Sequence, residues 1–253
     1  MSDEPYTDAV LYDLEYEHFD EDVSWYLGLA QQLAPRGPVI ELGCGTGRLT
    51  LPLAKAGIFT TGLDRAGPMV DRLEAKLRGE PAAVQEALCV LREDYRAYAP
   101  PEPVPLVLWP FNALHHLDSE ADLVSMLMRI RSWMGPHGTL ALDAYLPDPT
   151  LYGTDPERRH EQRRFVDPRD GIELESWEQG WWDAENQTSH VLQVYRRPDG
   201  TETRVHLALR MFTRRALHQA ISEAGWTLIS EFSDYQGTPL ADNALKWVAV
   251  LTT

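Results

Sequence analysis

The stretch VIELGCGTGR, residues 39–48, decides the fold of this 253-residue chain. Its apolar start is typical of a buried strand, its glycines make a tight turn, and a helical pattern follows directly. Glycine has no Cβ, so the backbone can turn sharply there and approach a ligand closely. This strand, turn and helix unit predicts an α/β fold with a ligand site at the turn.

The spacing of the glycines and the acid before them indicate the kind of ligand. Dinucleotide sites carry G-x-G-x-x-G and hold a pyrophosphate at a helix N-terminus, whereas Gly43, Gly45 and Gly47 follow G-x-G-x-G. Glu41 precedes the first glycine, where its carboxylate would repel a phosphate but suit an ammonium or a sulfonium. The pattern therefore favours S-adenosylmethionine over NAD.

Further apolar runs end in polar residues that extend this site. Asp64 closes the run 58–63, and a carboxylate about 20 residues after the turn can accept hydrogen bonds from ribose hydroxyls. Asp94 follows a run at 90–91 and is placed to accept from an adenine amino group. A fourth run, 106–109, leads into Phe111 and the pair His115-His116.

The order and spacing of these segments resemble the class I S-adenosylmethionine-dependent methyltransferases, by motif over residues 35–150 and by topology beyond them. The resemblance implies a Rossmann-like, seven-stranded mixed sheet flanked by helices, with strands 226–232 and 245–251 as an antiparallel edge hairpin. It also implies cofactor-binding residues: Glu41, Gly43, Cys44 and Gly45 at the methionine part, Asp64 at the ribose, Met69 over the adenine, Asp94 with Tyr95, and Phe111 through its backbone. Gly47 and Arg65 are assigned to the same site, and Phe111 stands where the family often has Asn or a small residue.

The segment before the core carries tyrosines that also fit the resemblance. In small-molecule members of the family such a segment folds over the cofactor and lines the acceptor pocket, which implies a cofactor contact for Tyr12 and a substrate contact for Tyr16. The alternative is that these rings only fix the terminus to the surface. Met69 is likewise either an adenine cover or a core residue.

The chain divides into four segments around one core. They are an N-terminal helical segment (1–34), the cofactor-binding core (35–150), an antiparallel β insert (151–212) and a C-terminal helix with the edge hairpin (213–253). Helical spacing predicts helices at 21–33, ended by Pro35 to Pro38, and at 49–56, 69–78 and 120–134. Gly135 to Gly138 is expected to separate the last of these from a strand at 139–143.

The insert has the pattern of a four-stranded meander. Asp170-Gly171 and Asp199-Gly200 are hairpin turn signals, and residues 183–187 form another polar break. Val205, Leu207, Leu209 and Met211 alternate and share one face. In the family such an insert roofs the acceptor site or forms a homodimer interface. The tryptophans Trp177, Trp181 and Trp182 then either form an aromatic acceptor wall, with Trp177 binding substrate, or pack between sheets.

Methyl transfer from an activated sulfonium requires alignment, exclusion of water and removal of one proton. For a hydroxyl acceptor, His115 or His116 is the candidate general base, although such a pair can also serve only to shape the loop. For an amine acceptor, burial can lower the amine pKa enough that no base is needed. Glu173, Glu175 and Glu178 could then attract the protonated amine, or be the solvated face of a strand.

Composition limits the partners and the compartment. A net charge of -16 repels phosphate backbones and anionic lipid headgroups, which argues against nucleic acid or membrane as substrate. Cys44 and Cys89 offer no disulfide framework or metal-ligand spacing, and no signal peptide or membrane span is evident, so we expect a cytoplasmic protein.

Three functions remain open on the sequence. The first is a methyltransferase acting on an oxygen or nitrogen of a small metabolite, such as a sugar or a natural-product intermediate. The second is a protein methyltransferase, for which we expect an open acidic groove rather than a roofed pocket. The third is a cofactor-binding relative that does not methylate, either a binding module or a cyclase.

Overall fold

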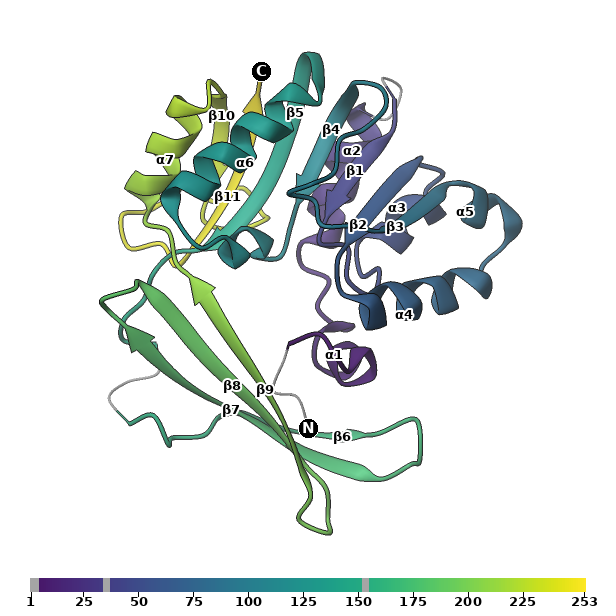
Figure 1. Cartoon of the computed structure of the whole chain (residues 1–253), viewed down its shortest axis with the longest axis vertical. Helices are drawn as coiled ribbons and strands as arrows, with labels where there is room; N and C mark the ends of the chain where they lie inside the picture. Colours follow the sequence, from purple (N-terminus) through teal and green to yellow (C-terminus); the bar gives the residue numbers. More distant parts are fainter. Residues whose placement is uncertain (1–4, 34–36, 152–154) are drawn as a thin grey trace.

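The structure is a computed structural model that describes residues 5–33, 37–151 and 155–253, so the predicted helix end at Pro35 lies outside the described residues. It contains a seven-stranded sheet flanked by helices and a separate four-stranded sheet (Figure 1). The order of the larger sheet is β10 (Thr227–Phe232), β11 (Lys246–Thr252), β5 (Met134–Tyr145), β4 (Val104–Trp109), β1 (Val39–Leu42), β2 (Thr60–Asp64) and β3 (Leu88–Arg92). Strand β11 runs antiparallel to both β10 and β5, and the other pairs are parallel, which confirms the predicted mixed sheet with an edge hairpin.

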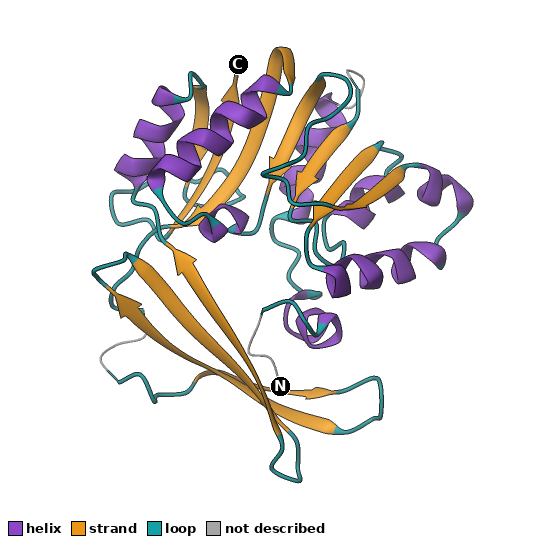
Figure 2. Ribbon diagram, in the orientation of Figure 1, coloured by secondary structure: helices purple, strands orange, loops and turns teal. Residues whose placement is uncertain are grey.

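Alternation along the strands builds a core on each face of this sheet. Ile40, Leu42 and Val107 face one way and pack with α6 (Glu120–Ser132) and α7 (Arg214–Glu223). Val39 and Leu106 face the other way and pack with α2 (Val23–Leu33) and α3 (Thr50–Lys55). Helices α4 (Gly67–Arg78) and α5 (Ala82–Glu86) lie beside β2 and β3 (Figure 2).

One boundary prediction was wrong. Gly135 to Gly138 do not break the chain between α6 and β5, because β5 already begins at Met134. Met134 pairs with Val104 and Thr139 pairs with Leu106, so the intervening residues bulge out of the ladder, with His137 at a φ of 59°. A bulge accommodates the glycines and the proline within one strand.

The insert forms the predicted meander, with β6 (His160–Val166), β7 (Glu173–Asp183), β8 (Thr188–Arg196) and β9 (Glu202–Arg210) in sequential antiparallel order. This sheet lies across the end of the larger sheet at which β1, β2 and β4 finish (Figure 1). Parallel strands expose their carboxyl ends at one edge, which is where α/β folds place ligands. The insert therefore covers the edge that carries the glycine turn.

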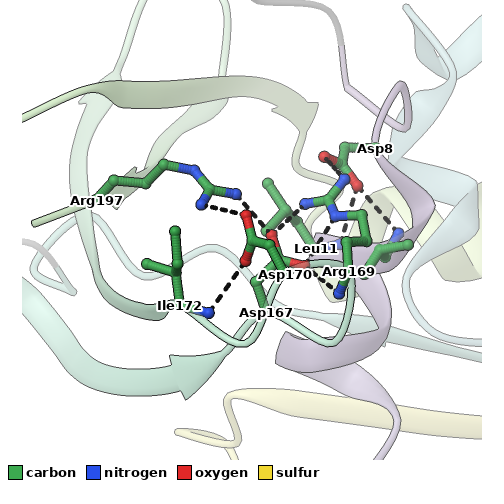
Figure 3. A network of polar contacts seen from close by, with 8 residues as sticks. Asp8, Leu11, Asp167, Arg169, Asp170, Ile172 and Arg197 are labelled. Atoms are coloured by element: carbon green, nitrogen blue, oxygen red, sulfur yellow. Dashed lines mark hydrogen bonds and ion pairs between the residues drawn. The ribbon is translucent and has the colours of Figure 1, made fainter. Parts of the chain in front are cut away.

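Helix α1 (Ala9–Tyr16) joins the two sheets. Toward the core, Asp13 accepts hydrogen bonds from Arg72 at 2.7 Å and Lys76 at 2.9 Å, both on α4. Toward the insert, the N-cap Asp8 pairs with Arg169 at 2.8 Å, and Arg169 also contacts Asp167 in the turn between β6 and β7 (Figure 3). Among the described residues, no helix is both long and apolar enough to cross a lipid bilayer.

Candidate active site

A cavity of about 700 Å³ lies between the core, α1 and the insert. This volume is typical of a site that encloses a small-molecule ligand. The glycine turn, α1, the loop after β4 and the inner face of the insert contribute its lining. The predicted site residues at this cavity are Tyr12, Tyr16, Glu41, Gly43, Cys44, Gly45, Asp64, Arg65, Met69, Asp94, Tyr95, Phe111, His115 and His116.

The glycine turn is held by its own N–H groups. Gly43 and Cys44 donate to the Leu63 carbonyl at 2.8 and 3.0 Å, and Gly45 donates to the Asp64 carboxylate at 2.9 Å. A phosphate site needs such N–H groups to point at the ligand. Since these donors are bonded within the protein, the turn is unsuited to a phosphate.

Glu41 places a buried carboxyl group at the same end of the cavity. It is only 2% exposed, and its Oε2 accepts a hydrogen bond of 2.6 Å from the Thr50 hydroxyl. Burial raises its pKa to about 8, despite the opposing effects of Thr50 and of the Arg48 charge. A cationic ligand beside Glu41 would favour the ionised carboxylate, which matches the ligand charge expected from the sequence.

Asp64 lies next to the turn with both oxygens oriented. Oδ2 accepts from the Gly45 N–H at 2.9 Å and Oδ1 accepts from the Ala66 N–H at 2.8 Å. Burial raises the pKa of Asp64, and these two N–H groups oppose the rise. Each carboxylate oxygen can accept more than one hydrogen bond, so Asp64 can still bind a pair of hydroxyls.

Met69 and Asp94 are two further predicted cofactor-binding residues at the cavity. Met69 is 1% exposed and also lines the cavity, so the core and ligand-facing alternatives coexist at one side chain. Asp94 is paired with Arg96, whose Nη2 lies 2.7 Å from Oδ2. This hydrogen bond lowers the pKa of Asp94 and keeps the carboxylate ionised.

The tyrosines of the N-terminal segment form an aromatic cover over the turn. The rings of Tyr12 and Tyr16 lie 4.9 Å apart, and Tyr6 lies 6.0 Å from Tyr12. A Cβ on Gly45 would lie 4.0 Å from the Tyr12 hydroxyl, which places that ring directly above the turn. The cover forms part of the cavity wall.

Arg48 ties the segment between α1 and α2 to the core, a role that the sequence did not suggest. Its guanidinium binds both oxygens of Asp22, at 2.5 and 2.7 Å, and donates to the Phe19 carbonyl at 2.9 Å. It also lies 4.4 Å from the centroid of the Phe111 ring.

The loop after β4 is held in a strained form by Asp143. Phe111 and Asn112 have φ values of 55° and 62°, which non-glycine residues rarely adopt. Their N–H groups donate to Asp143 at 3.0 and 3.3 Å, and the Tyr235 hydroxyl donates to it at 2.5 Å. Burial raises the pKa of Asp143 to about 6. The Phe111 N–H is therefore occupied and is not available to a ligand.

The two histidines have different surroundings. Both nitrogens of His115 face main-chain carbonyls, with Nδ1 2.7 Å from that of Arg210 and Nε2 3.1 Å from that of Tyr145. His116 Nε2 lies 2.8 Å from the Tyr6 hydroxyl. Burial lowers the pKa of each histidine to about 4. His115 is thus positioned as a support for the loop, and neither histidine holds a proton well near neutral pH.

The insert contributes one face of its sheet to the cavity. Side chains alternate across a strand, so residues of one parity line it, as the sequence predicted for the apolar stripe on β9. The lining residues from β7 to β9 and just beyond are Glu178, Trp182, Ser189, Val191, Gln193, Tyr195, Val205, Leu207, Leu209 and Met211.

Two predicted site residues lie outside the lining of this cavity. Trp177 has the opposite parity on β7, and its ring lies 3.9 Å from the Arg159 guanidinium carbon and 4.7 Å from that of Arg196. Trp182, on the cavity side, occupies the place expected for Trp177. Gly47 has a packing role, because a Cβ there would lie 2.3 Å from Leu73 Cδ1.

Comparison with known proteins agrees with this geometry. Residues 39–138 match the family described as a methyltransferase domain. An uncharacterized methyltransferase of Bacillus licheniformis is 30% identical over 138 residues, which cover 53% of this chain and 60% of that protein. The chain thus spans between half and two thirds of the length of the curated relatives it matches.

Solved structures show the same fold over almost the whole chain. The CcbJ methyltransferase from Streptomyces caelestis has a TM-score of 0.81 at 20% identity, covering 99% of this chain and 98% of that one. CalS10, an amino pentose methyltransferase from Micromonospora echinaspora solved with S-adenosylmethionine bound, has a TM-score of 0.71 at 16% identity, covering 96% and 94%.

The residues at the turn fit the cofactor of this family. S-adenosylmethionine is a cationic nucleoside without phosphate, and the turn pairs a buried carboxylate, Glu41, with N–H groups that are already bonded. Asp64 offers oriented oxygens for ribose hydroxyls. Residues 39–138 match the methyltransferase-domain family, and the fold of the chain is that of the class I S-adenosylmethionine-dependent methyltransferases.

Proposed function

We propose that this chain transfers a methyl group from S-adenosylmethionine to an oxygen or nitrogen atom of a small metabolite, such as a sugar or a natural-product intermediate. The observation that carries the proposal is the continuity of one cavity. Its lining runs from Glu41 and the glycine turn to the apolar stripe of β9, so a donor and an acceptor can share it.

The residues divide between the two ligands in this proposal. Glu41, the glycine turn, Asp64, Met69 and Asp94 hold the cofactor, and Tyr12 covers it. When bound, the cofactor supplies a methyl group that its sulfonium has already activated. The chain contributes alignment and exclusion of water, which are the main requirements for an in-line transfer.

The acceptor side of the cavity is closed by α1 and the insert. Leu11 on α1 packs with Leu174 and Tyr195 of the insert, and Glu15 bonds to Ser176 at 2.8 Å. A protein methyltransferase would need an open groove for a polypeptide, so this closure favours a small acceptor. CalS10, named an amino pentose methyltransferase, and KedS8, named a sugar N-methyltransferase, share the fold and support an acceptor of similar size.

We also propose that the acceptor is not a nucleic acid and that the chain forms a homodimer. The net charge of -16 argues against nucleic acid as acceptor. The outer face of the insert, where Trp181 is 39% exposed, is the surface for the homodimer expected from the sequence. Light scattering during gel filtration tests this dimer, and a monomer at all concentrations would remove it from the proposal.

Incubation with methyl-labelled S-adenosylmethionine and a metabolite extract tests the proposed reaction. We expect label in the small-molecule fraction, dependent on Asp64. Label in protein would indicate a protein methyltransferase. Bound cofactor with no transferred label would indicate a relative that does not methylate.

A further inference from the structure

One end of the cavity carries a group of carboxylates that the cofactor side does not use. We call it the carboxylate end, and it consists of Glu15 on α1, Glu161 on β6 and Glu178 on β7. Arg163 contacts Glu15 at 3.3 Å and Glu161 at 3.1 Å. One guanidinium therefore serves two of three carboxylates, which leaves this end of the cavity negative.

Glu178 lines the cavity, and among the described residues it forms no ion pair with Arg163. Burial raises its pKa to about 7; the charges of Glu15 and Glu161 add to the rise, and the charge of Arg163 opposes it. A cation beside Glu178 would relieve both effects. Its neighbours Glu173 and Glu175 have the opposite parity on β7 and approach Arg164 instead, at 3.0 and 4.0 Å.

Gln193 provides a second, independent sign of a ligand at this end. Its side chain is 5% exposed, it lines the cavity, and its Nε2 donates to Glu15 at 3.1 Å. Among the described residues its Oε1 has no hydrogen-bond partner. A buried carbonyl oxygen without a donor is costly, so a ligand with N–H groups would satisfy it.

The histidines favour the same kind of ligand. Transfer to a hydroxyl benefits from a base near the methyl group, but both nitrogens of His115 face carbonyls and Nε2 of His116 lies beside the Tyr6 hydroxyl. An amine bound as an ammonium becomes nucleophilic once it has lost a proton, and the Glu178 carboxylate beside it can accept that proton, so that no histidine base is needed. A cation with several N–H donors suits three carboxylates and an amide oxygen.

We propose that the carboxylate end, with the Gln193 amide, binds an ammonium group of the acceptor, so that the acceptor is a basic amine. This inference rests on the proposed function and narrows it to a substrate class. Glu178 and Gln193 are then specificity-determining residues, and Glu15 holds Gln193 in place through its hydrogen bond.

The test compares matched amine and alcohol probes on the protein saturated with S-adenosylhomocysteine. The pairs are cyclohexylamine with cyclohexanol, and the methyl glycoside of glucosamine with that of glucose. We expect the amine of each pair to bind more tightly in titrations followed by ligand NMR. Glu178→Gln should weaken the amines by about 10- to 100-fold, the effect of one charged hydrogen bond, and leave the alcohols unchanged.

Two control variants accompany Glu178→Gln. Glu173→Gln on the same strand removes an equal charge outside the cavity and should change no probe, whereas Glu178→Asp keeps the charge and should retain the preference for amines. Amines that bind no better than alcohols, or equally well to Glu178→Gln, overturn the inference. Cofactor affinity, measured separately, tests the proposed function, because Glu178 lies at the acceptor end and its substitution should leave that affinity intact.

Discussion

Removal of the Asp64 carboxylate should weaken cofactor binding while leaving the protein folded. In Asp64→Ala, the ribose loses an ionised acceptor, and a charged hydrogen bond contributes about 1.5–3 kcal/mol. At 25 °C this corresponds to a loss of about 10- to 100-fold in affinity. The N–H groups of Gly45 and Ala66 also lose their acceptor, but both lie near the cavity, where water can replace it. We therefore expect a stability loss of only about 1–3 kcal/mol.

Isothermal titration calorimetry with S-adenosylmethionine measures the affinity, and urea unfolding of the cofactor-free protein measures the stability. Asp71→Ala is the matched control, because Asp71 is an exposed aspartate on the neighbouring helix α4. The control should bind as the wild type does. Unchanged affinity in a folded Asp64→Ala protein would refute the assignment of Asp64 to the ribose.

Three further predictions concern Glu41, the histidines and the insert. Burial raises the pKa of Glu41 from 4.5 to about 8, so folding favours its protonated form. The stability that this group contributes is present at low pH and is lost as the pH rises through about 8. The urea midpoint of the cofactor-free protein should therefore fall between pH 6 and pH 9, and it should fall less in Glu41→Gln. Since burial holds the pKa of His115 and His116 at about 4, the pH–rate profile should show no inflection from a histidine near neutral pH. An inflection near pH 7 that disappears in His116→Asn would contradict this prediction. Trp177→Ala should lower the free energy of unfolding in urea by about 3–5 kcal/mol without changing the KM for the acceptor. Trp182→Ala should raise that KM, because Trp182 lines the cavity. The reverse pattern would show that Trp177 binds the acceptor.

The fold and the cofactor side of the site could be predicted because their signals are local. The glycine turn, Glu41 and Asp64 lie at the ends of apolar runs, and parallel strands bring such ends to one edge. The insert was also predictable as a meander, because two of its three turns carry Asp-Gly pairs and the third is a polar break. The bulge in β5 was not, since Gly and Pro usually end an element.

The acceptor side depends on contacts that the sequence does not reveal. Alternation shows that Trp177 and Trp182 occupy opposite faces of β7, but it does not say which face meets the core. The contact between Glu15 and Gln193 joins residues far apart in the chain. Asp143 gave a weak signal, as an acid near the end of a strand, yet its role depends on the positive φ values of Phe111 and Asn112.

The central claim is that the cavity binds a cationic nucleoside at the end formed by the core and a small acceptor at the end formed by the insert. A crystal structure with S-adenosylmethionine bound tests this most directly. We expect the ribose hydroxyls at Asp64, the methionine part between Glu41 and the glycine turn, and the methyl group directed toward the face of the insert that carries Leu207. Density for the cofactor elsewhere, or a methyl group directed away from the insert, would contradict the claim.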